Sequence, residues 1–296
     1  MSVVVPTFNR SVELCRCLDS LIAQTFQEFE VLVCDDGSTD DTCEVVSKYK
    51  YFLDITYDYA ENFGGPARPR NRGIALARAP YVAFLDSDDW WDSDKLLISL
   101  RHLDEGADVV FHDLWNVESS EQMVFNRRVK SDQPTVPVYE SLLCCGSSIP
   151  NSSVVTRIDL LRRIGGVSED RDLIAVEDFD TLLRISKLTD KFQRIDKCLG
   201  YYWNGGGNIS SASAKYIGRI SAVYQRHIGD LSKESGMKAQ SILNYRMGRV
   251  AEIHGDYEGA LIYFGKSTNR HLGFRYWVKA VVVIGKIKLK KIFGFG

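Results

Sequence analysis

Along the first 115 residues, short apolar runs alternate with segments in which apolar residues recur at helical spacing. Leu14, Leu18, Leu21 and Ile22 recur at helical spacing between two such runs. The apolar runs, each four to six residues long and followed by polar residues, predict strands in "SVVVP" (2–6), "FEVLVCDDGS" (29–38), "LDITYDY" (53–59), "YVAFLDSDD" (81–89) and "ADVVFHD" (107–113). Helices are predicted between them, at 12–24, 42–48, 71–77 and from 95 onward.

This alternation of strands and helices predicts an α/β fold with a mostly parallel sheet flanked by helices. Parallel neighbours need a crossover, and a helix of this length supplies one. In open sheets of this kind, ligands bind outside the carboxyl ends of the strands. The residues that follow each strand are therefore the first candidates for a functional site.

Polar clusters stand at three of these strand ends. The first strand ends in Pro6, Thr7, Phe8 and Asn9; the second in Asp35, Asp36, Gly37 and Ser38; the fourth in Asp86, Ser87, Asp88 and Asp89. One such cluster alone is typical of a turn or a helix cap. Three at successive strand ends of one sheet favour a binding site.

The chemistry of these clusters suits a nucleotide held through a cation. Neither the GxGxxG of a dinucleotide-binding unit nor the GxxxxGK[ST] of a P-loop follows the first strand. Carboxylates bind hydroxyls, N–H groups and hard divalent cations rather than bare phosphate. A cation between Asp88 and a diphosphate would join an acidic protein to an acidic ligand.

Charge and cysteine content narrow the class of protein. The net charge of −2 argues against a broad nucleic-acid-binding face. From Arg270 onward the chain has seven basic residues and no acidic one, so residues 1–269 carry a net charge of −9. Seven scattered cysteines without a CxxC pair, and a strand directly after Met1, predict a reduced, cytoplasmic chain.

The last third of the chain predicts helices. Residues 244–269 read as two short amphipathic helices joined at Gly255 and Asp256, and their small and aromatic positions resemble one tetratricopeptide-like hairpin. Residues 276–293 are apolar but are interrupted by lysines. Such a segment predicts either a helix lying in the headgroup layer of a membrane or a terminal helix packed on its own domain.

Four segments together resemble the inverting family 2 glycosyltransferases with the GT-A fold, a Rossmann-like nucleotide-diphospho-sugar transferase fold of bacterial-type glycan and cell-surface polysaccharide biosynthesis. The segments are "VVVPTFNR", "VLVCDDGSTDDT", "NFGGPARPRNRGIALARA" and "YVAFLDSDDWW". Their order and separations match over about residues 2–115, and the match continues more weakly to about residue 210. The resemblance divides the chain into a catalytic domain at 1–212 and a helical extension at 213–296, which holds the hairpin and the basic tail. The catalytic domain has a nucleotide-sugar half at 1–115 and an acceptor half at 116–212.

The resemblance implies roles for the residues at the strand ends. Pro6, Thr7 and one of Asp35 and Asp36 would hold the donor base. Arg70 and Asn71 would also belong to the donor site, where the arginine would reach the base or the phosphates. Asp86 would face the ribose, with Asn9 and Ser87 as further donor contacts. Arg68 would be an added diphosphate contact or a surface charge. Asp88 would bind Mn²⁺ or Mg²⁺.

The resemblance also implies an acceptor side. In "VEDFD" (176–180), Asp178 would be the base that takes the acceptor proton, with Glu177 as the reserve. The alternative is that these acidic residues only stabilise the first turn of a helix by complementing its dipole. Trp90 and Trp91 would flank the sugar or acceptor, unless they fill the core. The glycine-rich loop 201–211 would close over the diphosphate, with Asn208 and Ser210 as weak candidate contacts.

The expected function is a metal-dependent inverting glycosyltransferase. It would move a sugar, most simply from a UDP-linked donor, to a hydroxyl of a glycan or lipid-linked acceptor. The expected partners are a nucleotide sugar, that acceptor, and the inner membrane face through residues 270–296, with no nucleic acid. The alternatives are a non-catalytic sugar-nucleotide-binding or scaffold subunit and a nucleotidyltransferase, and the latter lacks its glycine-rich loop after the first strand.

Overall fold

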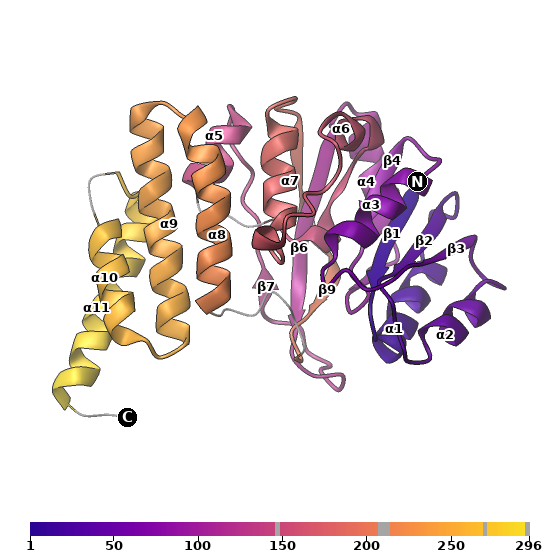
Figure 1. Cartoon of the computed structure of the whole chain (residues 1–296), viewed down its shortest axis with the longest axis horizontal. Coiled ribbons are helices and arrows are strands. Elements are labelled where there is room, and N and C mark those ends of the chain that lie inside the picture. Colours follow the sequence, from indigo (N-terminus) through magenta and orange to yellow (C-terminus); the bar gives the residue numbers. More distant parts are fainter. Residues whose placement is uncertain (146–148, 207–213, 269–270, 294–296) are drawn as a thin grey trace. The chain divides into compact units, whose positions relative to one another are not determined.

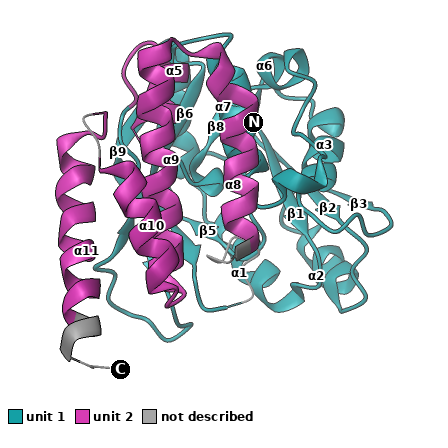
Figure 2. Cartoon of the chain, turned by 60° about the vertical axis from the view of Figure 1, so that its left-hand side comes forward, with its two compact units in different colours: residues 1–133, 147–208 teal, residues 134–146, 209–296 magenta. Residues whose placement is uncertain are grey.

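The computed structural model describes residues 1–145, 149–206, 214–268 and 271–293. These residues form two compact units, one of residues 1–133 and 147–208, and one of residues 134–146 and 209–296 (Figures 1 and 2). The second unit therefore includes residues 134–146, which the sequence analysis assigned to the catalytic domain. The short helix α5 (Val138–Cys144) explains the difference, since it packs with α9 rather than with the sheet.

The first unit is built on one mixed sheet. Its order is β3-β2-β1-β4-β8-β6-β9-β5, and β7 pairs with β6 off this path. The strands are β1 (Ser2–Thr7), β2 (Glu30–Asp35), β3 (Ile55–Tyr59), β4 (Tyr81–Phe84), β5 (Trp90–Trp91), β6 (Val109–Val117), β7 (Arg128–Val129), β8 (Val155–Arg157) and β9 (Phe192–Trp203).

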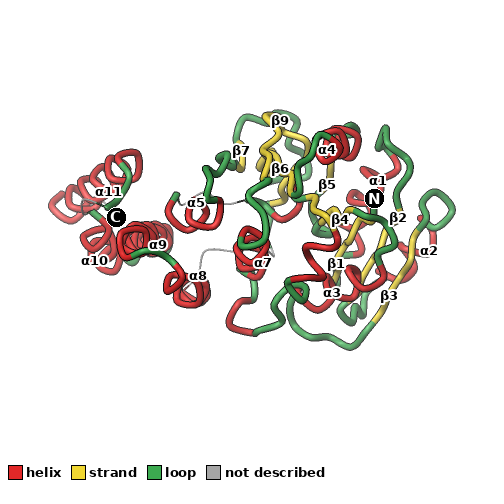
Figure 3. The backbone as a smooth tube through the Cα atoms, turned by 90° about the horizontal axis from the view of Figure 1, so that it is seen from above, coloured by secondary structure: helices red, strands yellow, loops and turns green. Residues whose placement is uncertain are grey.

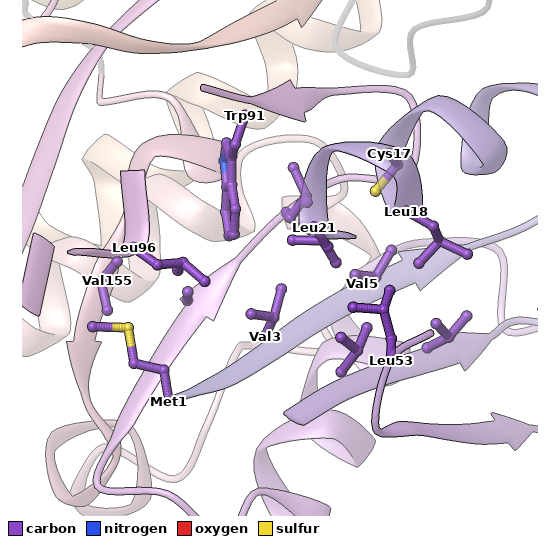
Figure 4. Packing of buried hydrophobic residues seen from close by; sticks show 14 of the residues in the cluster. Met1, Val3, Val5, Cys17, Leu18, Leu21, Leu53, Trp91, Leu96 and Val155 are labelled. Atoms are coloured by element: carbon purple, nitrogen blue, oxygen red, sulfur yellow. The ribbon is translucent and has the colours of Figure 1, made fainter. Parts of the chain in front are cut away.

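The first four strands are parallel, as the alternation predicted. β1 lies between β2 and β4, and β2 pairs with β3. Side chains of β1 alternate between the two faces of the sheet: Val3 and Val5 join a buried cluster with Leu18 and Leu21 of α1 (Figure 4). On the other face, a Cβ at Gly73 would lie 2.5 Å from a methyl group of Val4, so only glycine lets α3 approach β1 this closely.

Helices cover both faces of this sheet (Figure 3). The buried cluster joins one face to residues of α1, α2 and α4, whereas α3 contacts β1 and β2 from the other face. The helices and 3-10 turns of the unit are α1 (Ser11–Ile22), α2 (Thr42–Tyr49), α3 (Ala67–Leu76), α4 (Lys95–Asp104), η1 (Asn151–Ser153), α6 (Ile158–Arg163), η2 (Arg171–Leu173) and α7 (Glu177–Ser186). The predicted α/β fold with a sheet between helices is confirmed.

The other half of the sheet is mixed. β8 is antiparallel to both β4 and β6, and β5 and β7 pair antiparallel with β9 and β6. Only the β6–β9 pair is parallel here. Strands of two or three residues, such as β5 and β8, leave no apolar period that a sequence pattern could reveal.

The second unit is helical. It contains α5, α8 (Ala214–His227), η3 (Ile228–Asp230), α9 (Lys233–Ile253), α10 (Tyr257–Ser267) and α11 (Phe274–Phe293). The predicted hairpin is present as α9 and α10, but α9 begins eleven residues before the predicted segment. A Cβ at Gly248 would meet the Phe264 ring at 2.8 Å, so the missing side chain allows the two helices to pack closely. Asp256 caps α10 by accepting from the Gly259 N–H at 2.9 Å.

The terminal helix α11 has one buried and one exposed apolar face. Ala280, Val283 and Ile287 are buried, and α11 contacts α10. Trp277, Val278, Val281, Val282 and Leu289 are exposed. Among the helices in the described ranges, none combines the length and the hydrophobicity needed to span a bilayer.

Candidate active site

The loops after β1 and β2 are bound to each other at the edge where the polar clusters were predicted. The Oδ1 of Asn9 accepts from the Thr39 N–H at 2.8 Å, and the Asn9 N–H donates to the Ser38 Oγ at 2.8 Å. Asn9 has a φ of 50°, a left-handed conformation that asparagine tolerates better than most residues. Asn9 is therefore a link between two strand ends.

Thr7 has a hydroxyl without a partner at the same edge. Thr7 is 4% exposed, and its Oγ1 has no hydrogen-bond partner among the described residues. Pro6, next to it, pairs with Cys34 of β2 and is buried. Buried hydroxyls without a partner are rare in proteins, so Thr7 marks a position where a ligand or water can bond.

The two aspartates after β2 are buried and hold their own loops. Asp35 accepts from the Ser38 N–H at 2.7 Å and from the Tyr57 hydroxyl at 2.6 Å. Asp36 accepts from the backbone N–H groups of Phe63 and Gly64 at 3.1 Å. A carboxylate has about four acceptor positions, so each could accept one more bond from a base. Their predicted contact with the donor remains a prediction.

The acidic loop after β4 holds its carboxylates in different surroundings. Asp86 and Asp88 are partly exposed, with 31% and 21% of their side chains accessible. Burial and the nearby Asp86 charge raise the pKa of Asp88 to about 6, although the Arg10 guanidinium, 4.0 Å away, acts in the opposite direction. Ser87 is buried between them.

Asp89 serves the structure rather than a ligand. It is 2% exposed and accepts from the Trp203 N–H at 2.8 Å. Burial raises its pKa well above the usual range, and the charges of Asp88 and Asp86 add to the rise. Its hydrogen bond therefore ties the acidic loop to the last residue of β9.

The partly exposed carboxylates of Asp86 and Asp88 have the donor chemistry that a divalent cation prefers. Within the described ranges, no group of three histidine, cysteine or acidic residues could hold a metal ion by itself. Mg²⁺ and similar ions often bind through one or two carboxylates and take their other ligands from phosphates and water. Two neighbouring carboxylates that repel each other are a donor set of that kind.

The two tryptophans of β5 point in opposite directions, as neighbouring residues of a strand do. Trp91 is 3% exposed, its Nε1 donates to the Ser152 carbonyl at 2.7 Å, and the Lys95 ammonium lies 3.6 Å from the centre of its ring. The predicted acceptor contact of Trp91 is therefore wrong, because the residue fills the core. Trp90 is only partly buried.

Three residues of α3 contact the loop before α7 and the first turn of α7, which carries the predicted base Asp178. The Arg70 guanidinium is 5% exposed and pairs with Asp86 at 2.7 Å and with Glu177 at 2.5 Å. The Asn71 amide accepts from the Val167 N–H at 2.8 Å and donates to the Val167 carbonyl at 2.9 Å. Arg68 pairs with Glu169 at 3.0 Å.

These contacts bear on the expected roles of the three α3 residues. Of the two alternatives for Arg68, its exposed ion pair agrees with a surface charge, and the diphosphate contact stays a prediction. The amide of Asn71 binds the loop before α7. Gly166 allows this loop to approach, since it has a φ of +80° and a Cβ there would lie 2.5 Å from the Asn71 Oδ1. The Arg70 guanidinium connects the acidic loop to α7. Its contact with the donor stays a prediction.

Asp178 has the properties of a general base. It lies in the first turn of α7 and is partly exposed. Burial and the neighbouring Glu177 charge raise its pKa to about 7, although the Arg70 charge acts in the opposite direction. A base works best when its pKa lies near the working pH. Ala175, three residues earlier, has a φ of 69°, a strained value of the kind that gathers at functional sites.

Glu177 is less available than Asp178. It is 2% exposed, and its Oε1 is bound by Arg70. Its Oε2 has no hydrogen-bond partner in the described part of the chain. Glu177 therefore anchors α7 through Arg70, while its neighbour faces a less enclosed position. Asn208 and Ser210, the weak loop candidates, lie outside the described residues.

Several site residues escaped the sequence analysis. Arg16 of α1 lies 3.8 Å from the centre of the Trp90 ring and donates to the Asp88 carbonyl at 3.0 Å. Asn151 and Ser152 of η1 adjoin Asp86, whose N–H donates to the Ser152 Oγ at 3.1 Å. The sequence offered one sign of a role for Arg16: a charged residue next to the buried positions of α1.

Known proteins share this fold. The S. aureus TarS fragment 1–349 in complex with UDP-GlcNAc superposes with a TM-score of 0.64 and 22% identity, covering 93% of this chain and 82% of that one. The mannosyltransferase PcManGT from Pyrobaculum calidifontis in complex with GDP-Man and Mn²⁺ gives a TM-score of 0.59 and 17% identity, covering 100% and 87%. The fold is thus the GT-A fold of glycosyltransferases.

Sequence relatives identify the family. The model of glycosyl transferase family 2 matches residues 2–133. The amylovoran biosynthesis glycosyltransferase AmsB of Erwinia amylovora is 32% identical over 209 residues, 68% of each chain. The Escherichia coli glucosyltransferase WfaP, named for UDP-Glc and α-D-GlcNAc-diphosphoundecaprenol, is 28% identical over 75% of this chain and 84% of its own. The chain belongs to glycosyl transferase family 2, which confirms the resemblance.

Other relatives match only in part. An uncharacterized glycosyltransferase of Rickettsia felis is 41% identical over 112 residues, which are 38% of this chain and 18% of that protein. The chain thus spans about a fifth of the length of such relatives.

Proposed function

We propose that this protein is an inverting, metal-dependent glycosyltransferase that moves a sugar from a UDP-linked donor to a hydroxyl of a glycan or lipid-linked acceptor. One observation carries the proposal. Arg70 pairs with both Asp86 of the acidic loop and Glu177 of α7, and so it joins the donor side of the site to the helix that bears Asp178.

The donor would lie across the ends of β1, β2 and β4. Thr7 supplies a hydroxyl that has no hydrogen-bond partner within the described ranges. Asp36 lies beside it, since the Asp36 N–H donates to the Thr7 carbonyl at 2.9 Å. Asn9, Pro6, Asp35 and Ser87 shape the same edge. A relative named for UDP-Glc and a neighbour bound to UDP-GlcNAc support uracil as the base.

A Mn²⁺ or Mg²⁺ ion would be held by Asp88, with Asp86 beside it. When bound, such an ion neutralises charge that develops on the departing diphosphate. The neighbour solved with GDP-Man and Mn²⁺ supports this requirement. Asp88 and Asp86 would place the diphosphate; their mutual repulsion favours a cation between them.

The transfer would proceed by a single displacement. The acceptor oxygen forms a bond to the anomeric carbon, the bond from that carbon to the diphosphate oxygen breaks, and its electron pair stays on the diphosphate. Asp178 takes the proton of the acceptor hydroxyl. Attack on the face opposite the leaving group inverts the configuration.

A thermal-shift panel tests the donor class. UDP, GDP, dTDP and CDP are each added with and without Mn²⁺, because a ligand that binds only the folded state raises the melting temperature. UDP with Mn²⁺ is expected to give the largest shift; at 100 times its Kd it contributes about 2.7 kcal/mol. No shift with any nucleotide would favour the scaffold alternative, and a larger shift with another nucleotide would replace uracil.

We propose further that α11 binds an anionic membrane surface. Its exposed apolar side chains, among them Val281 and Val282, lie on the same helix as the exposed Lys279, Lys286 and Lys288. An amphipathic helix of this composition inserts apolar side chains while its lysines attract anionic lipids. A lipid-linked acceptor would be reached from such a surface.

Co-sedimentation with vesicles tests this contact. The protein is expected to bind vesicles that contain phosphatidylglycerol and to bind pure phosphatidylcholine vesicles much less. Replacing Lys279, Lys286 and Lys288 by glutamine should weaken binding by roughly 1 kcal/mol per lysine. Lys233→Gln, at an exposed position on α9, is the control. Equal binding by the triple variant and the wild type would remove the membrane proposal.

A further inference from the structure

A row of four aromatic side chains leads away from the acidic loop in the first unit. Trp90 of β5 stacks on Tyr201 of β9, with ring centres 5.0 Å apart and planes 9° apart. Phe125 meets Tyr201 edge-on at 5.0 Å, and Trp115 of β6 lies 6.5 Å from Phe125. We call Trp90, Tyr201, Phe125 and Trp115 the aromatic row.

The sheet register builds this row. Trp90 is paired with Tyr201 across β5 and β9, and Trp115 is paired with Tyr201 across β6 and β9. Phe125 comes from the connection between β6 and β7. Three strands and one loop therefore bring together residues that are up to 111 positions apart in the sequence, at Trp90 and Tyr201.

The row begins at the candidate catalytic loop. The Arg16 guanidinium lies between the Trp90 ring at 3.8 Å and the Trp203 ring at 4.6 Å, and it donates to the Asp88 carbonyl. At the other end, the Arg128 guanidinium lies 4.8 Å from the centre of the Trp115 ring. Each end of the row is thus closed by a cation over an aromatic face.

The rings of the row are not core residues. All four are partly exposed, whereas Trp91, the sequence neighbour of Trp90, is 3% exposed. Packing alone would bury such large apolar rings, because burial of apolar area is favourable. A line of partly exposed rings that starts at a candidate catalytic loop is instead suited to a ligand with flat apolar faces and polar edges, the character of a sugar ring.

We propose that the far end of the aromatic row is the binding site for an oligosaccharide portion of the acceptor, with sugar rings lying against Phe125 and Trp115. Trp90, covered by Tyr201 and Arg16, connects these two rings to the acidic loop. This inference rests on the proposed function, because it places the acceptor beside Asp88. It assigns acceptor recognition to Phe125 and Trp115, which lie beyond the donor and the base.

An array of immobilised bacterial oligosaccharides tests the row. The labelled full-length protein is expected to bind one or more glycans, and Phe125→Ala or Trp115→Ala should weaken that binding about threefold to tenfold, the range of a single aromatic contact. Phe125→Tyr should retain binding, since it keeps the ring. Tyr51→Ala, which removes an 89% exposed ring after α2, is the matched control and should leave binding unchanged.

The rate at which UDP-Glc or UDP-GlcNAc is hydrolysed with water as the acceptor is measured in parallel. It is expected to be unchanged in Phe125→Ala and Trp115→Ala, because hydrolysis needs no glycan. The proposed glycan site would be wrong if the wild-type protein bound no glycan, or if the variants bound as well as the wild type, even with hydrolysis intact. Absence of hydrolysis with every nucleotide sugar would count instead against the transferase proposal.

Discussion

Replacement of Asp178 by asparagine is expected to lower the transfer rate by about 10²- to 10⁴-fold, the usual contribution of a general base. Asparagine keeps the shape of the side chain but cannot take a proton. Donor affinity in the thermal-shift assay should stay near the wild-type value, because the change lies on the acceptor side. The rate is measured as release of UDP from the donor, with acceptor or with water.

The pH dependence gives a second readout of the same residue. The pKa of Asp178 is raised to about 7 by burial and by the Glu177 charge, and the base works only when it is deprotonated. In the wild type, kcat/KM should therefore rise with pH up to about 7 and then level off. In the Asp178→Asn variant this limb should disappear.

Three measurements distinguish a catalytic base at Asp178 from a residue that only supports the fold. Asp172→Asn changes an exposed aspartate of the preceding 3-10 turn and should leave the rate unchanged. The melting temperature of Asp178→Asn should not fall, because burying an ionised carboxylate is costly. If Glu177→Gln removed the pH limb while Asp178→Asn kept it, Glu177 would be the base.

Replacement of Asp88 by asparagine is expected to abolish stimulation by Mn²⁺ and to lower the rate by about 10²-fold or more, comparable to the loss of one electrostatic stabiliser of the transition state. An amide oxygen carries no charge to hold the cation, and the departing diphosphate then loses its neutralisation. UDP release with increasing Mn²⁺ measures the effect.

The same variant makes a prediction about stability without metal. Asp88 and Asp86 repel each other, and burial adds to the cost of the Asp88 charge. Removing that charge should therefore keep or raise the melting temperature of the metal-free protein, while the extra shift from UDP with Mn²⁺ is lost. Asp94→Asn, at the exposed start of α4, is the control. Full Mn²⁺-stimulated activity in Asp88→Asn would exclude Asp88 as the ligand.

The α3 residues show which contacts a sequence pattern leaves out. The helix predicted at 71–77 is present, but it begins four residues earlier, at Ala67, so "ARPRN" starts the helix. Its side chains, however, bind the loop 166–169 and Glu177, about 100 positions later in the chain. No local pattern records which carboxylate a long side chain such as Arg70 will meet, because that depends on the packing of distant segments.

Trp90 and Trp91 show that a sequence pattern cannot decide which of two neighbouring aromatic residues is buried. "WW" after the acidic loop gave no reason to separate a core ring from a surface ring. A two-residue strand paired with β9 decides it, since the pleat turns Trp91 inward and Trp90 outward. The same pairing created the aromatic row, which the sequence analysis did not foresee.

The sequence by itself determined the first half of the sheet and the identity of its polar strand ends. Apolar runs with period two and helices with period 3.6 are local signals, and parallel strands joined by helices follow from their alternation. The tertiary structure alone decided the antiparallel half, the Arg70 bridge between Asp86 and Glu177, and the raised pKa of Asp178. These features come from pairing, burial and charge between segments far apart in the chain, and such contacts leave no periodic trace in the sequence.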